Sequence, residues 1–228
     1  MRGNRGGDPS DGRLGARPGG GAPASGGPSG LHTLEVGGLP VGLRYVPPDP
    51  RGLIVLLHGA GGRARQAVDL LGARLDDAGL IVLAPDSGAA TWDLLVGGFG
   101  PDAARIDAGL ADTFERYAVA ADRVAIGGFS DGASYALSLG LTNGDLFPSL
   151  VAFSPGFAAP ATVRGSPRVF VSHGVADRVL PIDRCGRRVA RLLRESGLDV
   201  RYEEFPGGHA VPLHVVDLAL AWLDGMGD

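Results

Sequence analysis

Lysine is absent from this sequence, and cysteine nearly so. All 21 cationic residues are arginines, which excludes a Schiff-base lysine, a serine–lysine pair and the lysine of a phosphate-binding Walker loop. The single cysteine, Cys185, can form neither an internal disulfide nor a cysteine-rich zinc site. We therefore expect a fold that is stabilised by packing, without any of these three reaction chemistries.

Excess positive charge and long apolar runs are missing as well. The formal net charge is −4 at pH 7, so no basic field covers the whole domain to attract nucleic acid or an anionic membrane. The sequence contains no run of about 18 apolar residues, so no membrane-spanning helix is predicted. The N-terminus also lacks the apolar core of a secretory signal. We expect a cytoplasmic protein with no nucleic-acid partner and no membrane span.

The first thirty residues differ in composition from the rest of the chain. Residues 1–30 are dominated by Gly, Pro, Arg and Ser and hold almost no large apolar side chain, so little buried surface would offset the entropy of ordering them. We expect a disordered tail there. The whole chain has 228 residues, of which 44% are hydrophobic, and this suits one globular domain, which we place at residues 31–228.

Short apolar runs alternate with longer segments of helical periodicity beyond this tail. The continuously apolar runs predict strands covered on both faces; they are residues 53–57, 80–83, 124–126, 150–153 and 169–171. The segments of helical period predict covering helices at residues 63–78, 102–118, 131–141, 182–196 and 213–223. More polar strands are expected at residues 32–36, 43–46 and 200–205. The alternation predicts an α/β fold with a doubly wound, mostly parallel sheet.

Ser130 follows one of these apolar runs and stands between Gly128 and Gly132. A strand before this Gly-x-Ser-x-Gly motif and a helix after it are typical of a nucleophile elbow, in which the serine occupies a strained turn. Side chains in place of the two glycines would collide with the neighbouring strand and helix. The N–H groups at the start of the helix favour the negative oxygen that forms when a serine attacks a carbonyl. Ser130 is therefore the candidate nucleophile.

A serine hydroxyl is a weak nucleophile until a base accepts its proton. Among the five histidines, His209 follows a flexible Gly-Gly step after the late strand, where a loop can bring the imidazole to the strand ends. We predict His209 as the base and keep His214, inside the last expected helix, as the alternative. Because the imidazole must be neutral to act, activity should fall below about pH 6.5, the ordinary pKa of histidine.

The base in turn needs a carboxylate to fix its tautomer. Asp177 comes a few residues after a buried strand, in a loop placed to reach the histidine. Three other aspartates have simpler expected roles: Asp131 and Asp183 at the starts of helices and Asp199 at the start of a strand. The resulting chain order, serine then aspartate then histidine, is the order of α/β-hydrolases.

A glycine-rich loop, residues 58–62, follows the first buried run. The backbone can approach a ligand closely at such a loop, and its N–H groups can complete an oxyanion hole. We predict the two donors to be the N–H of Ala60 and the N–H of Asp131, which follows the nucleophile. As a dinucleotide-binding loop the same glycines fit poorly, because the third glycine is missing from its required place.

Four segments together resemble the α/β-hydrolase superfamily and, within it, the bacterial phospholipase/carboxylesterase family of small serine esterases. They are residues 56–62, 125–133, 172–181 and 205–209, and the resemblance extends over residues 40–225. It implies hydrolysis of carboxylic esters through an acyl-enzyme, without a metal or an organic cofactor. By this resemblance the catalytic triad is Ser130, Asp177 and His209. The oxyanion positions are Ala60 and Asp131.

Two loops bear on the substrate of such a site. Residues 154–167 leave only a short connection where these folds usually insert a lid domain, so we expect no lid and an open site for small or medium esters. Trp92, in a long loop, is a candidate for lining the pocket, with packing of that loop onto the core as the alternative. The triad leaves thioesterase, peptidase and acyltransferase open. A catalytically silent binding module is a further alternative.

Overall fold

The computed structural model describes residues 9–19 and 27–225. Its strands are β1 (Gly30–Val36), β2 (Leu39–Val46), β3 (Gly52–Leu57), β4 (Leu80–Pro85), β5 (Val124–Phe129), β6 (Ser149–Phe153), β7 (Arg168–Gly174) and β8 (Val200–Phe205). Its α-helices are α1 (Ala64–Asp69), α2 (Pro101–Arg116), α3 (Asp131–Thr142), α4 (Gly186–Glu195) and α5 (Leu213–Asp224). No helix in this part of the chain combines the length and the apolar character needed to cross a bilayer.

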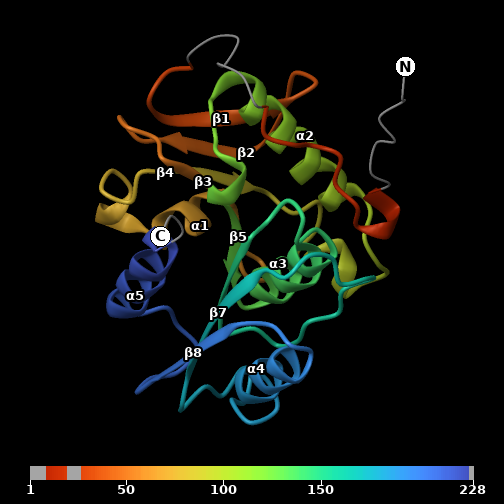
Figure 1. Cartoon of the computed structure of the whole chain (residues 1–228), viewed down its shortest axis with the longest axis vertical. Coiled ribbons are helices and arrows are strands. Elements are labelled where there is room, and N and C mark those ends of the chain that lie inside the picture. The colour runs from red at the N-terminus through yellow and green to blue at the C-terminus, as the bar shows by residue number, and fades with distance from the viewer. Residues whose placement is uncertain (1–8, 20–26, 226–228) are drawn as a thin grey trace.

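The strands form one sheet in the order β1-β2-β4-β3-β5-β6-β7-β8 (Figure 1). The β1–β2 and β2–β4 pairs are antiparallel, and every later pair is parallel. All residues of β3 and β4 are buried, as expected for strands that are covered on both faces. The predicted α/β architecture, with a doubly wound and mostly parallel sheet, is confirmed.

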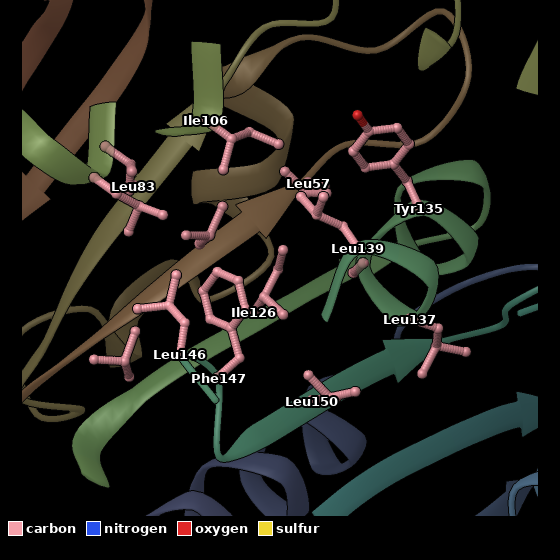
Figure 2. Close-up of a cluster of buried hydrophobic side chains, with 14 of the residues drawn as sticks. Leu57, Leu83, Ile106, Ile126, Tyr135, Leu137, Leu139, Leu146, Phe147 and Leu150 are labelled. Atoms are coloured by element: carbon pink, nitrogen blue, oxygen red, sulfur yellow. The ribbon is translucent and has the colours of Figure 1, made fainter. Parts of the chain in front are cut away.

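Alternation along β3 divides the core into two layers. Leu53, Val55 and Leu57 face a cluster that includes side chains of α2, α3 and α4, whereas Ile54 and Leu56 face a cluster with α1 and α5. Figure 2 shows part of the first cluster, in which sheet residues pack against helix residues of α2 and α3. Burial of each such aliphatic side chain contributes about 1.5–3 kcal/mol. This packing fixes the carboxyl ends of the parallel strands relative to one another.

The first crossover helix is shorter than the sequence predicts. The periodicity over residues 63–78 predicts one helix, but α1 ends at Asp69 and a separate 3-10 turn follows at Gly72–Arg74. Gly72 has φ +51°, a left-handed conformation that glycine adopts readily and that ends an α-helix. The apolar pattern continues through the break because Leu71 and Leu75, on either side of the 3-10 turn, pack in the same cluster as α1.

Residues 9–19 pack against the domain. Leu14 is 1% exposed and belongs to the main hydrophobic cluster. The guanidinium of Arg13 donates to both carboxylate oxygens of Asp145, at 2.7 and 3.0 Å. The carboxylate of Asp107 accepts hydrogen bonds from two backbone N–H groups of this segment, each at 2.8 Å. One apolar anchor and two polar anchors therefore hold the segment in place.

The structure differs here from the disordered tail expected over residues 1–30. That expectation averages composition over the whole stretch, and the average conceals single residues that have specific partners far along the chain. The order at residues 9–19 follows from those partners, because buried apolar contacts and the hydrogen bonds to Asp107 and Asp145 together oppose the ordering entropy of the segment. Residues 27–30 are also described, and β1 begins at Gly30. The remaining parts of the expected tail, residues 1–8 and 20–26, lie outside the described residues.

Candidate active site

Ser130 lies at the sharp turn that joins β5 to α3. Its backbone has φ 56° and ψ −119°, a conformation that costs a residue other than glycine about 1–3 kcal/mol. Its N–H donates to the carbonyl oxygen of Phe153 on the adjacent strand β6, at 2.9 Å. The hydrogen bond and the packed strand ends hold the turn in this strained form, which places the serine at the carboxyl end of β5.

The glycines on either side of Ser130 allow a close backbone approach. A Cβ atom on Gly128 would lie 2.6 Å from the carbonyl group of Gly132. A Cβ atom on Gly132 would lie 2.4 Å from the carbonyl oxygens of Leu57 and His58. Any side chain at either position would collide with backbone, so the glycines have the steric role that the sequence motif predicts.

Backbone hydrogen bonds join the loop after β7 to the loop after β8. The N–H of Val175 donates to Phe205 O at 3.0 Å, and the N–H of Ala176 donates to Gly207 O at 2.8 Å. A Cβ atom on Gly174 would lie 2.3 Å from the carbonyl oxygen of the glycine at 208, so the two loops pack without intervening side chains. This pairing brings Asp177 and His209 to the same place although they are 32 residues apart.

Three predicted side chains form a chain of hydrogen bonds. His209 Nε2 lies 2.8 Å from Ser130 Oγ, and His209 Nδ1 lies 2.6 Å from Asp177 Oδ2. The carboxylate can only accept, so Nδ1 carries a proton and Nε2 is free to accept the proton of the serine hydroxyl. His214, the alternative base, is exposed on α5 and has its ring edge against Phe205; it is not a partner of Ser130.

The carboxylate of Asp177 is buried, with no exposed side-chain surface. Burial by itself would raise the pKa of Asp177. The hydrogen bond from His209 and those from the N–H groups of Leu180 and Val179 outweigh it, so this pKa lies below its usual value. Both backbone donors are 2.9 Å from Asp177 Oδ1. The group is therefore ionised at neutral pH and available to stabilise a positive imidazolium.

The predicted oxyanion donors lie on the two segments that flank the serine. In the described part of the chain, the N–H groups of Ala60 and Asp131 have no hydrogen-bond acceptor. The loop of Ala60 is held by its neighbours: the N–H of Gly61 donates to Ala90 O at 2.6 Å, and that of Gly62 donates to Gly59 O at 3.0 Å. Both predicted N–H groups are thus free to bind an anionic oxygen.

Trp92 corrects one expectation. Its side chain is completely buried, so it does not line a pocket that is open to substrate. Its indole N–H donates to His58 O at 2.9 Å, and its ring lies against the rings of His58 and Tyr135, with centroids 4.8 and 5.2 Å away. The alternative holds instead: Trp92 packs the 85–101 loop onto the core, beneath the glycine-rich loop.

His58 is buried beside Trp92 in a single neutral form. Its Nε2 accepts the N–H of Ser87 at 3.1 Å, so the proton is on Nδ1, which donates to Gly59 O at 2.8 Å. Burial lowers the pKa of His58, and the neutral ring braces the start of the glycine-rich loop.

Sequence reasoning missed several neighbours of the three side chains. The ring of Phe129 packs against the imidazole of His209, with ring centroids 4.7 Å apart. The backbone donors to Asp177 come from Val179 and Leu180, and His173 lies beside the same carboxylate. Phe129 and His173 belong to segments that carry the family motifs, which was the only available signal, because their contacts arise from the fold.

A cavity of about 300 Å³ lies along the glycine-rich loop. The cavity is lined by residues 58–62, Gln66, Leu70 and Phe129. A Cβ atom on Gly59 would lie 3.3 Å from the Cβ of Ser130, so one lining residue of the cavity packs close to the serine. Between β6 and β7, residues 154–167 contain no helix or strand that could cover this opening. Ala60 is among the lining residues, whereas none of Ser130, Asp177 and His209 is.

A second cavity, of about 250 Å³ and more apolar, lies between residues 156–163 and α4. None of Ser130, Asp177 and His209 lines it. It therefore offers no direct contact with the chain of hydrogen bonds.

The chain is similar to several known proteins. Residues 103–224, more than half of the chain, match the phospholipase/carboxylesterase family. The acyl-protein thioesterase 1 of Neurospora crassa is 34% identical over 110 residues, which make up 43% of this chain and 44% of that protein. The match thus spans less than half the length of this curated relative.

Two solved structures share the fold at low sequence identity. The crystal structure of esterase PE8 is 24% identical with a TM-score of 0.68, and the match covers 82% of this chain and 98% of that one. The Bacillus cereus carboxylesterase is 19% identical with a TM-score of 0.64, and the match covers 80% and 92% of the two chains. The predicted α/β-hydrolase fold is confirmed.

Proposed function

This chain belongs to the phospholipase/carboxylesterase family, and on that premise we propose that it hydrolyses small or medium carboxylic esters through an acyl-serine at Ser130. The resemblance found in its sequence motifs is confirmed by the family match, which supports the proposal of a hydrolase. One observation supports the proposal above all others: the unbroken chain of hydrogen bonds from Asp177 through His209 to Ser130 Oγ.

In the proposed reaction, His209 Nε2 accepts the proton of Ser130 Oγ as the oxygen attacks the ester carbonyl. The imidazolium that forms is stabilised by the ionised carboxylate of Asp177, which also fixes the ring orientation. The proton then passes to the alkoxy group, and the alcohol leaves. A water molecule, deprotonated by the same imidazole, cleaves the acyl-serine and restores the free enzyme.

The N–H groups of Ala60 and Asp131 are the proposed oxyanion hole. They flank the serine from two segments and use no other acceptor among the described residues. Each such donor typically contributes about 3 kcal/mol to transition-state stabilisation. The helix α3 starts at Asp131, so the positive end of its dipole adds to the same effect.

The central test is the variant Ser130→Ala. We expect it to lose at least about 10³-fold in kcat for p-nitrophenyl acetate hydrolysis, because no nucleophile remains. Ser166→Ala, on an exposed loop, is the matched control and should keep wild-type activity. A fluorophosphonate should label the wild type on Ser130 and leave Ser130→Ala unlabelled. Undiminished turnover in Ser130→Ala would overturn the proposal.

Thioesterase activity is the second candidate. The curated relative from Neurospora crassa is named an acyl-protein thioesterase, and the same acyl-serine chemistry cleaves thioesters. We expect oxygen esters and thioesters of one acyl group to be turned over by the same site, and amides far more slowly. The measurement compares kcat/KM for a matched ester, thioester and amide. A kcat/KM that favours the amide would point to a peptidase instead.

A further inference from the structure

A second histidine, His173, lies directly behind the proposed triad. It belongs to β7, four residues before Asp177, and is completely buried. Its Nε2 lies 2.7 Å from the carbonyl oxygen of Leu180 and 3.2 Å from Asp177 Oδ2. The proposed mechanism does not use this ring, although it touches the carboxylate that the mechanism requires.

The contacts of His173 fix its protonation. A carbonyl oxygen can only accept, so Nε2 must carry the proton and donate it to Leu180 O, while Asp177 Oδ2 lies beside the same N–H at 3.2 Å. Nδ1 is buried and has no partner within the described part of the chain, so no acceptor would stabilise a second proton there. Burial also lowers the pKa of His173. The ring is thus a neutral donor at neutral pH.

Three hydrogen bonds and one further close contact surround the carboxylate of Asp177. The N–H groups of Val179 and Leu180 donate to Oδ1, the ring of His209 donates to Oδ2, and His173 Nε2 lies 3.2 Å from the same Oδ2. Together these contacts oppose rotation of the carboxylate away from His209. His173 also holds the loop that follows Asp177. Its Nε2 donates to the carbonyl oxygen of Leu180, and the N–H of the same Leu180 donates to Asp177.

We infer that His173 is a positioning residue for the proposed hydrolysis, which holds Asp177 Oδ2 in the orientation that directs His209 toward Ser130. The inference rests on the proposed function, because it assigns a role within that reaction. His173 touches neither the serine nor the substrate cavity. Its effect passes through the carboxylate.

The position of the ring depends on Gly186, the first residue of α4. A Cβ atom at this position would lie 2.6 Å from His173 Nδ1 and 2.7 Å from its Cγ. The absence of a side chain lets the start of the helix press against the ring and keep it over Asp177. Gly186→Ala therefore provides a way to displace the imidazole without changing its chemistry.

Few titratable groups face this ring. Asp177 and His209 lie on the loop side, Glu204 comes from β8, and Cys185 precedes α4. Glu204 is paired with Arg187 at 2.7 Å, and its pKa is lowered by that pair. Burial raises the pKa of the Cys185 thiol. Neither group titrates near neutral pH, so the pH profile there reports the histidines.

The test compares His173→Leu, which removes the donor, with His173→Gln, which keeps an N–H near the position of Nε2. We expect kcat of His173→Leu to fall about 10- to 100-fold, because a misplaced base costs that much, with KM within about twofold. Without the N–H beside Asp177 Oδ2, less positive charge faces that oxygen, so the carboxylate stabilises the protonated form of His209 more strongly. The acidic limb of the kcat/KM profile should therefore move to higher pH. His173→Gln should restore most of kcat.

Active sites are counted by the final stoichiometry of fluorophosphonate labelling, and kcat is calculated per labelled site. Unfolded molecules then do not lower the apparent kcat. His214→Gln, at an exposed position on α5, is the matched control and should leave kcat and the pH profile unchanged. Gly186→Ala should lower kcat in the same way as His173→Leu. Gly186→Ala therefore still tests the proposal if His173→Leu does not fold.

The two proposals fail in different ways. An inactive wild type, or an active Ser130→Ala, overturns the proposed function. If both behave as expected and His173→Leu keeps the wild-type kcat and pH profile per active site, the positioning role is overturned. Equal loss in the leucine and glutamine variants with an unmoved acidic limb would also overturn it, because that result describes a packing residue.

Discussion

Gly132 determines how closely α3 can approach β3 behind the serine. A Cβ atom there would lie 2.4 Å from two backbone oxygens, which have no room to move within a buried sheet. We expect Gly132→Ala to destabilise the fold by about 1–3 kcal/mol, the usual cost of overpacking. Displacement of Ser130 should also lower kcat by about 100-fold. Urea denaturation and p-nitrophenyl acetate hydrolysis measure the two effects.

The control for this substitution is Gly97→Ala. Gly97 is exposed, and no atom lies within 4 Å of the position that its Cβ would take. This variant should keep both stability and activity. Wild-type kcat in Gly132→Ala would contradict the steric account of the motif, and an equal loss in both variants would show that glycine content, rather than contact, matters.

Among the elements, the segment of residues 9–19 is the one whose contribution is least expected from the sequence. Leu14 is 1% exposed, and Leu14→Ala should lower the free energy of unfolding by about 2 kcal/mol, the low end for a buried leucine, because a segment near the terminus can relax. Leu39→Ala, at a residue that is 69% exposed, is the control. Thermal denaturation measures both.

Activity should be preserved in Leu14→Ala. The segment binds at Thr142 and Asp145, at the C-terminal end of α3, whereas Ser130 precedes the first turn. A 12-residue helix is about 18 Å long, so loss of the anchor should not reach the serine. A kcat that falls in proportion to stability would contradict this separation.

The elements that sequence reasoning located best are those with the most local signal. Continuous apolar runs predicted the buried strands such as β3 and β4, because a strand covered on both faces has no polar side. Prediction was poorer where one residue decides the outcome. Gly72 breaks the expected helix through its own backbone angle, and Arg13 orders a glycine-rich segment through an aspartate 132 residues away.

For the molecule as a whole, the sequence predicts the motif-bearing strand ends but not their spatial order. Ser130, Asp177 and His209 each follow a recognisable strand, and parallel strands present their carboxyl ends at one edge. The insertion of β4 between β2 and β3 leaves no local signature. The contact of His173 with Leu180 O has no local signature in the sequence either, because it depends on how a loop folds back after β7.

Buried neutral histidines and paired carboxylates together make stability depend on pH. Burial lowers the pKa of His58 and of His173, so the unfolded chain binds protons at pH values where the folded chain does not. The hydrogen bond from Arg13 lowers the pKa of Asp145, and its stabilising effect is present above the ordinary carboxyl pKa. Acidification should therefore destabilise the protein in two stages.

The first stage should begin as the pH falls below about 6.5, where unfolded histidines take up protons, and the second below about pH 4, where Asp145 and similar carboxylates do. The histidine stage can contribute at most about 1.4 kcal/mol per pH unit for each ring. Urea denaturation from pH 7.5 to 4.5 measures it. His173→Gln should show a smaller slope between pH 6.5 and 5 than the wild type, while His214→Gln, exposed on α5, should keep the full slope. Stability that rises as the pH is lowered from 7 to 5 would contradict the burial of two neutral rings, because a charged histidine would then be favoured by the fold.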